Sequence, residues 1–241
     1  VQGTGLASDL IAGMAGAAVN ANLGGRDHGA NYMEHAVIDW TRDKMGMPEG
    51  SSGVLVAGTS QATVIAFQAE RVRVMPGGRK TGQGAARLIA YAGDGIHNAT
   101  RKALELLGIG FENLRLVPLV KGQMDLQTLR AQIAQDRADG AQPFLIVGMA
   151  GSVDLGTYDD LEGLADVAEA EDLWLHVDGA FGAWTRIADD PWRGLSDGIG
   201  RADSIALDFH KWMYVGYDCG LVLIADGDAH RAAFAARPSY L

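Results

Sequence analysis

Residues 203–212 read DSIALDFHKW, and this stretch decides how the rest of the chain is interpreted. Its apolar run, Ser204–Leu207, is typical of a buried strand that stops at Asp208, and His210 and Lys211 follow side by side. A lysine is rarely buried without a partner or a task, so this one indicates a functional site. For an isolated lysine, a side chain that reaches solvent from a strand end would be the simpler interpretation.

Short apolar runs alternate with helical patterns on both sides of this stretch. The runs predicted as strands are Val54–Ala57, Leu88–Ala92, Leu114–Val117, Phe144–Gly148, Trp174–Val177, Ser204–Leu207 and Leu221–Ile224. The segments predicted as helices are 6–19, 30–45, 60–71, 97–107, 125–137 and 159–170, with N-caps at Asp125 and at Asp159 or Asp160. This alternation predicts an α/β fold of three layers, with a mostly parallel sheet between helices. Ligands of such sheets bind beyond the carboxyl ends of the strands.

Composition limits the classes of function. The 241 residues suffice for one large domain, and a formal net charge of −10 argues against nucleic acid and, more weakly, against an anionic membrane as partner. The single cysteine, Cys219, excludes an intrachain disulfide and fits a reducing compartment such as the cytoplasm. No run approaches the ~20 apolar residues that span a bilayer. The chain begins at Val1, so we expect a piece of a longer protein.

The first predicted strand is followed by Gly58-Thr59-Ser60-Gln61 and then a helix. A tight turn, two hydroxyls and the free N–H groups of a helix N-terminus form an anion site that suits a phosphate. Simple capping of the helix by Thr59 or Ser60 explains the same residues. The pattern is not a P-loop, because no Gly-Lys-Ser/Thr follows.

Two further strand ends are followed by small residues, and one of them also by a histidine. His97 follows a glycine-rich turn at the start of a predicted helix, where a histidine can cap the helix, pack or contact a ligand. Ala150-Gly151-Ser152 is a turn whose small residues allow close approach to the backbone, and a plain connecting loop explains it equally well.

The stretch WLHVDGAFGA, residues 174–183, ends its strand on Asp178. A carboxylate at the end of a buried strand needs a cationic partner, although capping remains possible. Lys211, in a desolvated pocket, would be an amine nucleophile. A phosphate site, a flat ring, a buried anion and an amine, each at the carboxyl end of a strand, together match what pyridoxal phosphate requires.

Four stretches carry a resemblance to a known family: GVLVAGTSQATVIAF (53–67), IHNATRKALELLGI (96–109), GTYDDLEGLADVAEAEDLWLHVDGAFG (156–182) and ADSIALDFHKWMYVGYDCG (202–220). They resemble the group II pyridoxal-phosphate-dependent amino-acid decarboxylases, which act on aromatic amino acids, glutamate, cysteine sulfinate or diaminobutyrate. The resemblance implies the large domain of a fold type I pyridoxal-phosphate enzyme over residues 1–241. The N-terminal helical segment and C-terminal small domain of the family would lie largely outside this chain.

The resemblance also implies roles for individual residues. Lys211 would attach the cofactor through a Schiff base, and Asp178 would pair with the protonated pyridine nitrogen. His97 would stack on one face of the ring and Ala180 would pack on the other. His176 would lie behind Asp178 as a supporting residue.

The phosphate would be held by Thr59 and Ser60, with Asp208 or His210 contributing from the lysine side. Ser152 is predicted as a further cofactor contact. The chain departs from the family at three places: many members have Gly-Thr-Thr at Gly151-Ser152-Val153, animal members have Asn-Pro at Asp208-Phe209, and Ala is common at Gly179.

The resulting prediction is decarboxylation of an L-amino acid to an amine and CO2 by a cytoplasmic homodimer with its site at the subunit interface. Three other activities of the same fold stay open: an aminotransferase, a carbon–carbon lyase or an aldehyde synthase. A non-catalytic relative is a further alternative. A nucleotide-binding Rossmann domain would need G-x-G-x-x-G after the first strand, which GTSQAT lacks. No metal site is predicted, since His28 and His35 have no tight cluster of ligands around them.

Overall fold

The computed structural model describes residues 4–22 and 27–235 as eight helices, nine strands and four short 3-10 segments within those ranges. A seven-stranded sheet has the order β1-β9-β8-β7-β6-β2-β3. Its strands are β1 (Ser52–Val56), β2 (Leu88–Gly93), β3 (Leu114–Val117), β6 (Gln142–Met149), β7 (Trp174–Asp178), β8 (Ser204–Asp208) and β9 (Gly220–Ile224). A two-stranded hairpin pairs β4 (Leu119–Val120) with β5 (Gln123–Met124).

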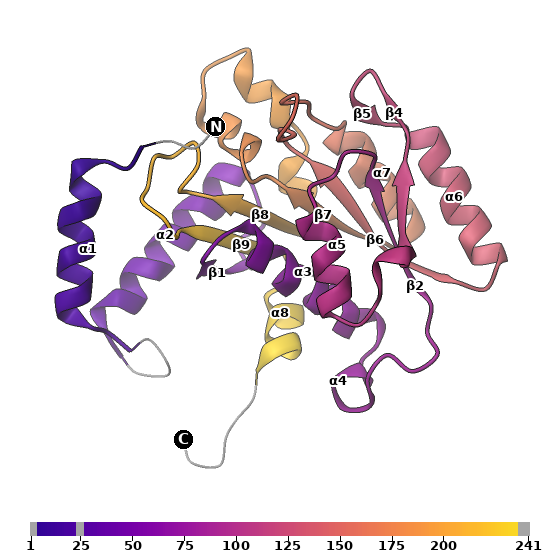
Figure 1. Ribbon diagram of the computed structural model, residues 1–241, viewed down its shortest axis with the longest axis horizontal. Coiled ribbons are helices and arrows are strands. Elements are labelled where there is room, and N and C mark those ends of the chain that lie inside the picture. The colour runs from indigo at the N-terminus through magenta and orange to yellow at the C-terminus, as the bar shows by residue number, and fades with distance from the viewer. Residues whose placement is uncertain (1–3, 23–26, 236–241) are drawn as a thin grey trace.

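Helices cover both faces of this sheet (Figure 1). They are α1 (Ala7–Val19), α2 (Gly29–Met45), α3 (Thr59–Val74), α4 (Gly78–Thr81), α5 (Ala99–Leu106), α6 (Leu126–Ala138), α7 (Leu161–Glu171) and α8 (Gly227–Phe234). The 3-10 segments are η1 (Phe111–Asn113), η2 (Gly182–Ile187), η3 (Trp192–Ser196) and η4 (Ile199–Arg201). The predicted three-layer α/β fold is therefore confirmed.

Alternation along the strands divides the core into two layers. Val222 and Ile224 of β9 pack in one cluster with residues of α3, α5 and α8, whereas Leu221 and Leu223 pack in the other with residues of α2, α6 and α7. Because successive side chains of a strand point to opposite faces, a sheet covered on both faces needs apolar residues at nearly every position. This requirement explains why the strands appear in the sequence as continuous apolar runs.

Six of the seven strands run in one direction. β8 is parallel to β7, and β9 is antiparallel to both β8 and β1, so β1 runs parallel to β8. Val56 and Asp208 are both in register with Gly220 of β9. The ends of β1 and β8 therefore flank the start of β9 at one edge of the sheet.

The structure corrects several predicted boundaries. β1 covers Ser52–Val56 rather than Val54–Ala57, and α3 extends to Val74. The helix predicted from 97 begins at Ala99, with Asn98 as its N-cap. Of the two cap candidates for α7, Asp160 accepts a hydrogen bond from the Gly163 N–H and is the cap.

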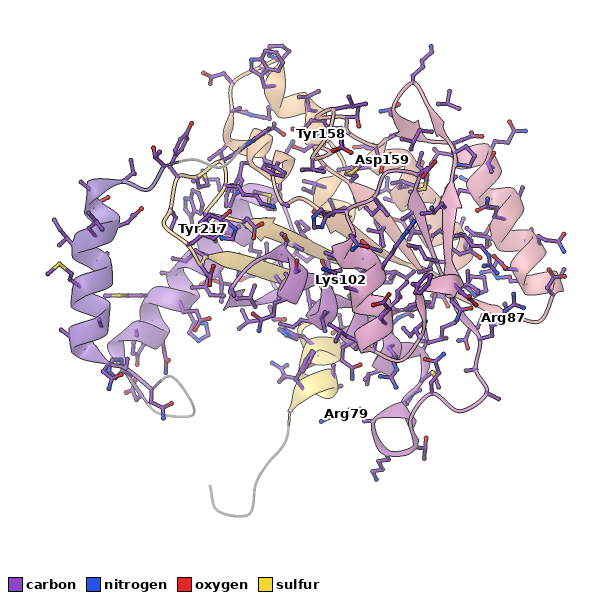
Figure 2. All side chains as sticks on the ribbon, viewed as in Figure 1. Arg79, Arg87, Lys102, Tyr158, Asp159 and Tyr217 are labelled. Atoms are coloured by element: carbon purple, nitrogen blue, oxygen red, sulfur yellow. The ribbon has the colours of Figure 1, made fainter. Side chains whose placement is uncertain are left out.

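Asp159 has a different role from its neighbour. Its buried carboxylate accepts the N–H groups of Met124 (2.7 Å) and Met149 (2.9 Å), which joins the β4–β5 hairpin to the end of β6. Tyr158 and Asp159 lie in the loop that leads from β6 toward α7 (Figure 2). The hairpin, α4, α8 and the 3-10 segments were not predicted.

Helix α1 lies apart from the sheet layers (Figure 1), and none of its residues is buried. Leu10, Ile11 and Met14 are 74%, 72% and 75% exposed. Within residues 4–22 and 27–235, no helix combines the length and the apolarity that crossing a bilayer requires. That residues 1–241 form the large domain of a longer enzyme stays a prediction.

Candidate active site

A cavity of about 220 Å3 opens at the edge of the sheet where the parallel strands end. Its lining residues are Thr59, His97, Met149, Gly151, Val153, Asp178, Ala180, Phe181 and Lys211. Five of these nine were predicted from the sequence, and they come from four different strand ends. The structure therefore brings together residues that lie up to 152 positions apart in the chain (211 − 59 = 152).

Lys211 lies three residues beyond the end of β8. Its ammonium nitrogen is 2.9 Å from an Asp208 oxygen and 4.2 Å from the centre of the Phe181 ring. An ion pair on one side and an aromatic face on the other restrict this long side chain, whose exposed fraction is 18%. The amine is thus held at the cavity wall.

Asp178 is the last residue of β7 and is half-buried at the cavity. Burial raises the pKa of its carboxyl; the Ala180 N–H, at 3.2 Å, and the charges of Lys211 and His97 oppose that rise. Within the described residues, no side chain donates a hydrogen bond to this carboxylate. A cation placed in the cavity would supply the partner that it lacks.

His97 lies exposed at the rim of the cavity, two residues before α5 begins. Its Nδ1 atom accepts the N–H of Ala99 at 3.2 Å, which ties the ring to the first residue of α5 while it lines the cavity. Ala180 is buried two residues beyond the end of β7. A flat ligand between them would meet an aromatic ring and a small side chain.

Thr59 and Ser60 form the first turn of α3 but differ in their partners. Thr59 donates its N–H (2.8 Å) and its hydroxyl (3.0 Å) to the carboxylate of Asp208. Ser60 is exposed, and within the described residues neither its N–H nor its hydroxyl has a hydrogen-bond partner. The donors available to an added phosphate at this helix end are therefore those of Ser60.

His210 and Asp208 lie behind Lys211 and do not line the cavity. The His210 Nδ1 atom accepts the backbone N–H of Cys219 at 3.0 Å, so a neutral ring carries its proton on Nε2, 3.6 Å from Asp208. Tyr217 stacks on His210 with ring centres 3.9 Å apart. Tyr217 lies on the loop between β8 and β9 (Figure 2) and has no signal in the sequence that predicts this contact.

Ser152 is not among the residues that line the cavity. Its hydroxyl contacts the Thr157 hydroxyl (2.9 Å) and N–H (3.0 Å) and the Leu155 N–H (3.3 Å), and so closes the loop 152–157. Gly151 lines the cavity instead, with a φ of +82° that disfavours any other residue.

His176 is fully buried two residues before Asp178 on the same face of β7. The Ser204 hydroxyl lies 2.8 Å from its Nδ1 and also accepts the Trp174 indole N–H at 2.7 Å. Burial lowers the pKa of His176 to about 3, so the ring is neutral. Its Nε2 atom has no hydrogen-bond partner in the described part of the chain. No hydrogen bond joins His176 to Asp178 there.

Sequence reasoning missed Met149, Val153 and Phe181, which complete the apolar part of the cavity lining. Phe181 could have been found, because it follows Asp178 by three residues in a stretch already singled out. Residues 23–26, which lie in the sequence between α1 and α2, are outside the described residues. Across residues 4–22 and 27–235, no three His, Cys, Asp or Glu side chains gather as a metal site would require.

Comparison with known proteins decides the family. The model of the pyridoxal-dependent decarboxylase conserved domain matches residues 6–241. This chain belongs to the pyridoxal-dependent decarboxylase family. The predicted family is thereby confirmed, and so is pyridoxal phosphate as the cofactor on which the family depends.

Individual members of the family show how much of a whole enzyme is present. An aromatic-L-amino-acid decarboxylase of Bacillus atrophaeus is 32% identical over 214 residues, which cover 88% of this chain and 43% of that protein. The acidic amino acid decarboxylase GADL1 of Homo sapiens is 34% identical over 212 residues, 87% of this chain and 40% of that protein. The chain thus spans less than half the length of these curated relatives.

Solved structures agree with the fold. The glutamate decarboxylase domain of a Vibrio parahaemolyticus diaminobutyrate–pyruvate transaminase and L-2,4-diaminobutyrate decarboxylase superposes with a TM-score of 0.87 at 29% identity. That match covers 96% of this chain and 52% of the other. A 4-hydroxyphenylacetaldehyde synthase of Rhodiola rosea superposes with a TM-score of 0.88 at 27% identity, covering 97% of this chain and 52% of that one.

Proposed function

We propose that this decarboxylase-family chain is the cofactor-binding part of an enzyme that removes CO2 from an L-amino acid and leaves the amine. The observation that carries the proposal is the single cavity onto which Lys211, Asp178 and His97 converge. Pyridoxal phosphate needs an amine near its aldehyde, an anion near its ring nitrogen and an aromatic ring against its ring face. Lys211, Asp178 and His97 supply these groups in that order.

The residues fit this cofactor on independent grounds. The raised pKa of Asp178 reflects a carboxyl group whose ionisation is costly in the cavity as it stands. A protonated ring nitrogen beside it would offset that cost. Ser60 offers a free N–H and hydroxyl at the N-terminus of α3, where a phosphate is favoured.

Each residue then has a defined task. When bound, pyridoxal phosphate supplies an aldehyde that an amine captures and a protonated ring that accepts the electron pair of the bond broken at Cα. Asp178 would keep a proton on the ring nitrogen, and His97 and Ala180 would fix the plane of the ring. Lys211 would hold the cofactor covalently until the substrate amine replaces it, and the Phe181 face would orient the Lys211 side chain.

A homodimer with its site at the subunit interface remains part of the proposal. Helix α1 supports it, because Leu10, Ile11 and Met14 form an apolar stripe that the described residues leave exposed. The mass of the full-length protein in solution, measured by light scattering, would be twice the chain mass. The cytoplasm remains the proposed location, which the single free thiol of Cys219 fits.

The second candidate is an aldehyde synthase, because a structure that covers 97% of this chain carries that name. The two reactions give different products. Decarboxylation yields one CO2 and one amine per substrate. An aldehyde synthase also releases CO2, but it consumes O2 and water and yields the aldehyde, ammonia and hydrogen peroxide in place of the amine. An aminotransferase would give a keto acid and no CO2.

Product analysis on the full-length protein tests the proposal. Pyridoxal phosphate and a panel of aromatic, acidic and basic L-amino acids are supplied, and CO2, amine, aldehyde and peroxide are quantified for each. Equal amounts of CO2 and amine from one substrate class are expected. Peroxide and aldehyde in place of amine would replace the proposal with the synthase, and bound cofactor without CO2 would replace it with transamination or lyase chemistry.

A further inference from the structure

The buried carboxylate of Asp208 occupies the position at which the sequence predicts a phosphate contact. It is 1% exposed and accepts both donors of Thr59, at 2.8 and 3.0 Å, while Lys211 lies 2.9 Å away. The His210 Nε2 atom lies 3.6 Å from the same carboxylate. This side chain therefore already occupies the two donors of Thr59 at the start of α3, together with the Lys211 ammonium.

Two glycines make room for this arrangement. A Cβ atom on Gly220 would lie 2.8 Å from the Asp208 Oδ1 atom and 2.6 Å from the Gly58 Cα atom. A Cβ atom on Gly58 would lie 3.4 Å from the same oxygen and 3.3 Å from the His210 ring. The backbone on both sides thus encloses the carboxylate and opposes its rotation away from Thr59.

Thr59 and Ser60 consequently have different functions at the same helix end. The N–H and hydroxyl of Thr59 are directed inward to Asp208, whereas those of Ser60 have no partner in the described part of the chain. A phosphate seated on Ser60 would be next to a fixed carboxylate of the same charge sign. Like charges at close range in a partly buried site repel strongly.

We infer that Asp208 is an internal anion of the phosphate cradle, which occupies the two hydrogen-bond donors of Thr59 and weakens the binding of the cofactor's phosphate group. This inference rests on the proposed function, since it concerns the pyridoxal phosphate that the function requires. Asp208 is thus a positioning residue that sets how readily the cofactor is released, and Ser60 is the side chain that binds the phosphate.

Comparison of pyridoxal phosphate with pyridoxal tests the inference, because the two ligands differ only in the phosphate group. Affinities are measured by titration of the full-length protein after its cofactor has been removed. Asp208→Asn keeps the shape of the side chain and removes its charge. The variant should bind pyridoxal phosphate about tenfold more tightly than the wild type, and pyridoxal with an affinity within about twofold.

Asp218→Asn is the matched control, because it removes an exposed carboxylate from the loop that follows β8. It should leave both affinities unchanged. The inference is overturned if Asp208→Asn binds pyridoxal phosphate no more tightly than the wild type. It is also overturned if both ligands gain equally, since Asp208 would then act through the lysine or the ring.

A second pair of variants gives an answer even if Asp208→Asn does not fold. Ser60→Ala should weaken pyridoxal phosphate about tenfold, whereas Thr59→Val should change it less than about threefold, because the Thr59 hydroxyl is held by Asp208. An equal loss in the two variants would overturn the inference. A wild type that binds neither ligand would instead overturn the proposed function, and the inference with it.

Discussion

The ends of β7 and β8 lie side by side, and each strand ends in an aspartate, yet the two carboxylates have opposite surroundings. Asp178 at the end of β7 faces the cavity and accepts one backbone N–H, and burial raises its pKa. Asp208 at the end of β8 accepts two hydrogen bonds from Thr59 and pairs with Lys211. The Asp178 carboxylate therefore has few hydrogen-bond donors, whereas the Asp208 carboxylate has two donors and a cation.

This difference separates a residue that awaits a ligand from one that organises the protein. A buried anion without a cation is unfavourable by itself and becomes favourable only when something positive binds beside it. A buried anion with its own donors needs nothing further, and an added anion nearby is repelled. The same residue type, as the last residue of two adjacent strands, therefore serves opposite purposes.

The largest loss of activity is expected at Lys211. Its ammonium group pairs with Asp208, and its charge opposes the rise in the pKa of Asp178. Lys211→Ala removes the amine that holds the cofactor, and turnover should fall about a thousandfold or more. Steady-state CO2 release by the full-length protein measures this. Lys102→Ala, on the exposed surface of α5 (Figure 2), is the control and should keep wild-type turnover. A Lys211→Ala enzyme with normal turnover would exclude the proposed chemistry.

The second effect concerns Asp178 alone. Asp178→Asn keeps the size of the side chain but removes the charge that would hold a proton on the ring nitrogen. Turnover should fall about a hundredfold or more. The far-ultraviolet circular dichroism spectrum, which reports the secondary structure, should be unchanged. Because the cavity keeps its other contacts, pyridoxal phosphate should still bind. Turnover within about twofold of wild type would show that the donor-poor carboxylate is not the ring partner.

Sequence reasoning predicted Asp178 and Lys211 because a charged residue directly after an apolar strand is visible in one dimension. The strands themselves were predicted for a similar reason, since a sheet buried on both faces leaves continuous apolar runs. The role of Asp208 was not predictable in this way. Its main partner, Thr59, lies 149 residues earlier, and only the antiparallel β9 between β1 and β8 brings the two together.

Short elements were missed for a different reason. The β4–β5 hairpin has two residues in each strand, too few for any period to show. Asp159 holds this hairpin to the end of β6, and its position beside Asp160 in the sequence suggested only a helix cap. Local chemistry indicates that a carboxylate has a backbone partner, and the fold determines which backbone it is.

The third prediction contrasts the two carboxylates through stability of the cofactor-free protein. The folded pKa of Asp178 is raised, so its contribution to the free energy of unfolding is present below the usual aspartate pKa and is lost as the pH rises. Asp178→Asn avoids that loss and should stabilise the cofactor-free protein increasingly as the pH rises above the usual aspartate pKa of about 4. Urea unfolding at a series of pH values measures this.

Asp208→Asn should have the opposite sign in the same experiment. It removes the charge that pairs with Lys211 and satisfies Thr59, and a cost of about 1–3 kcal/mol at neutral pH is expected. If both variants shift the free energy of unfolding in the same direction, the carboxylates of Asp178 and Asp208 do not have opposite electrostatic surroundings. With cofactor bound, Asp178→Asn should lose its advantage, because the wild-type carboxylate then has a partner.

The smallest effect is expected at a third strand end, that of β6. Ser152 was predicted to contact the cofactor, but its hydroxyl closes the loop 152–157 through Thr157 and Leu155. Ser152→Ala should therefore cost about 1 kcal/mol of unfolding free energy and change the affinity for pyridoxal phosphate by less than about twofold.

Ser60→Ala is the contrasting variant, with a loss of affinity and little loss of stability, since its hydroxyl has no partner in the described chain. Titration with pyridoxal phosphate measures the affinity of the two alanine variants, and urea unfolding measures their stability. Together they distinguish a hydroxyl that stabilises the fold from one that binds the ligand. A loss of cofactor affinity in Ser152→Ala equal to that in Ser60→Ala would place the β6 end among the ligand-binding ends of the sheet.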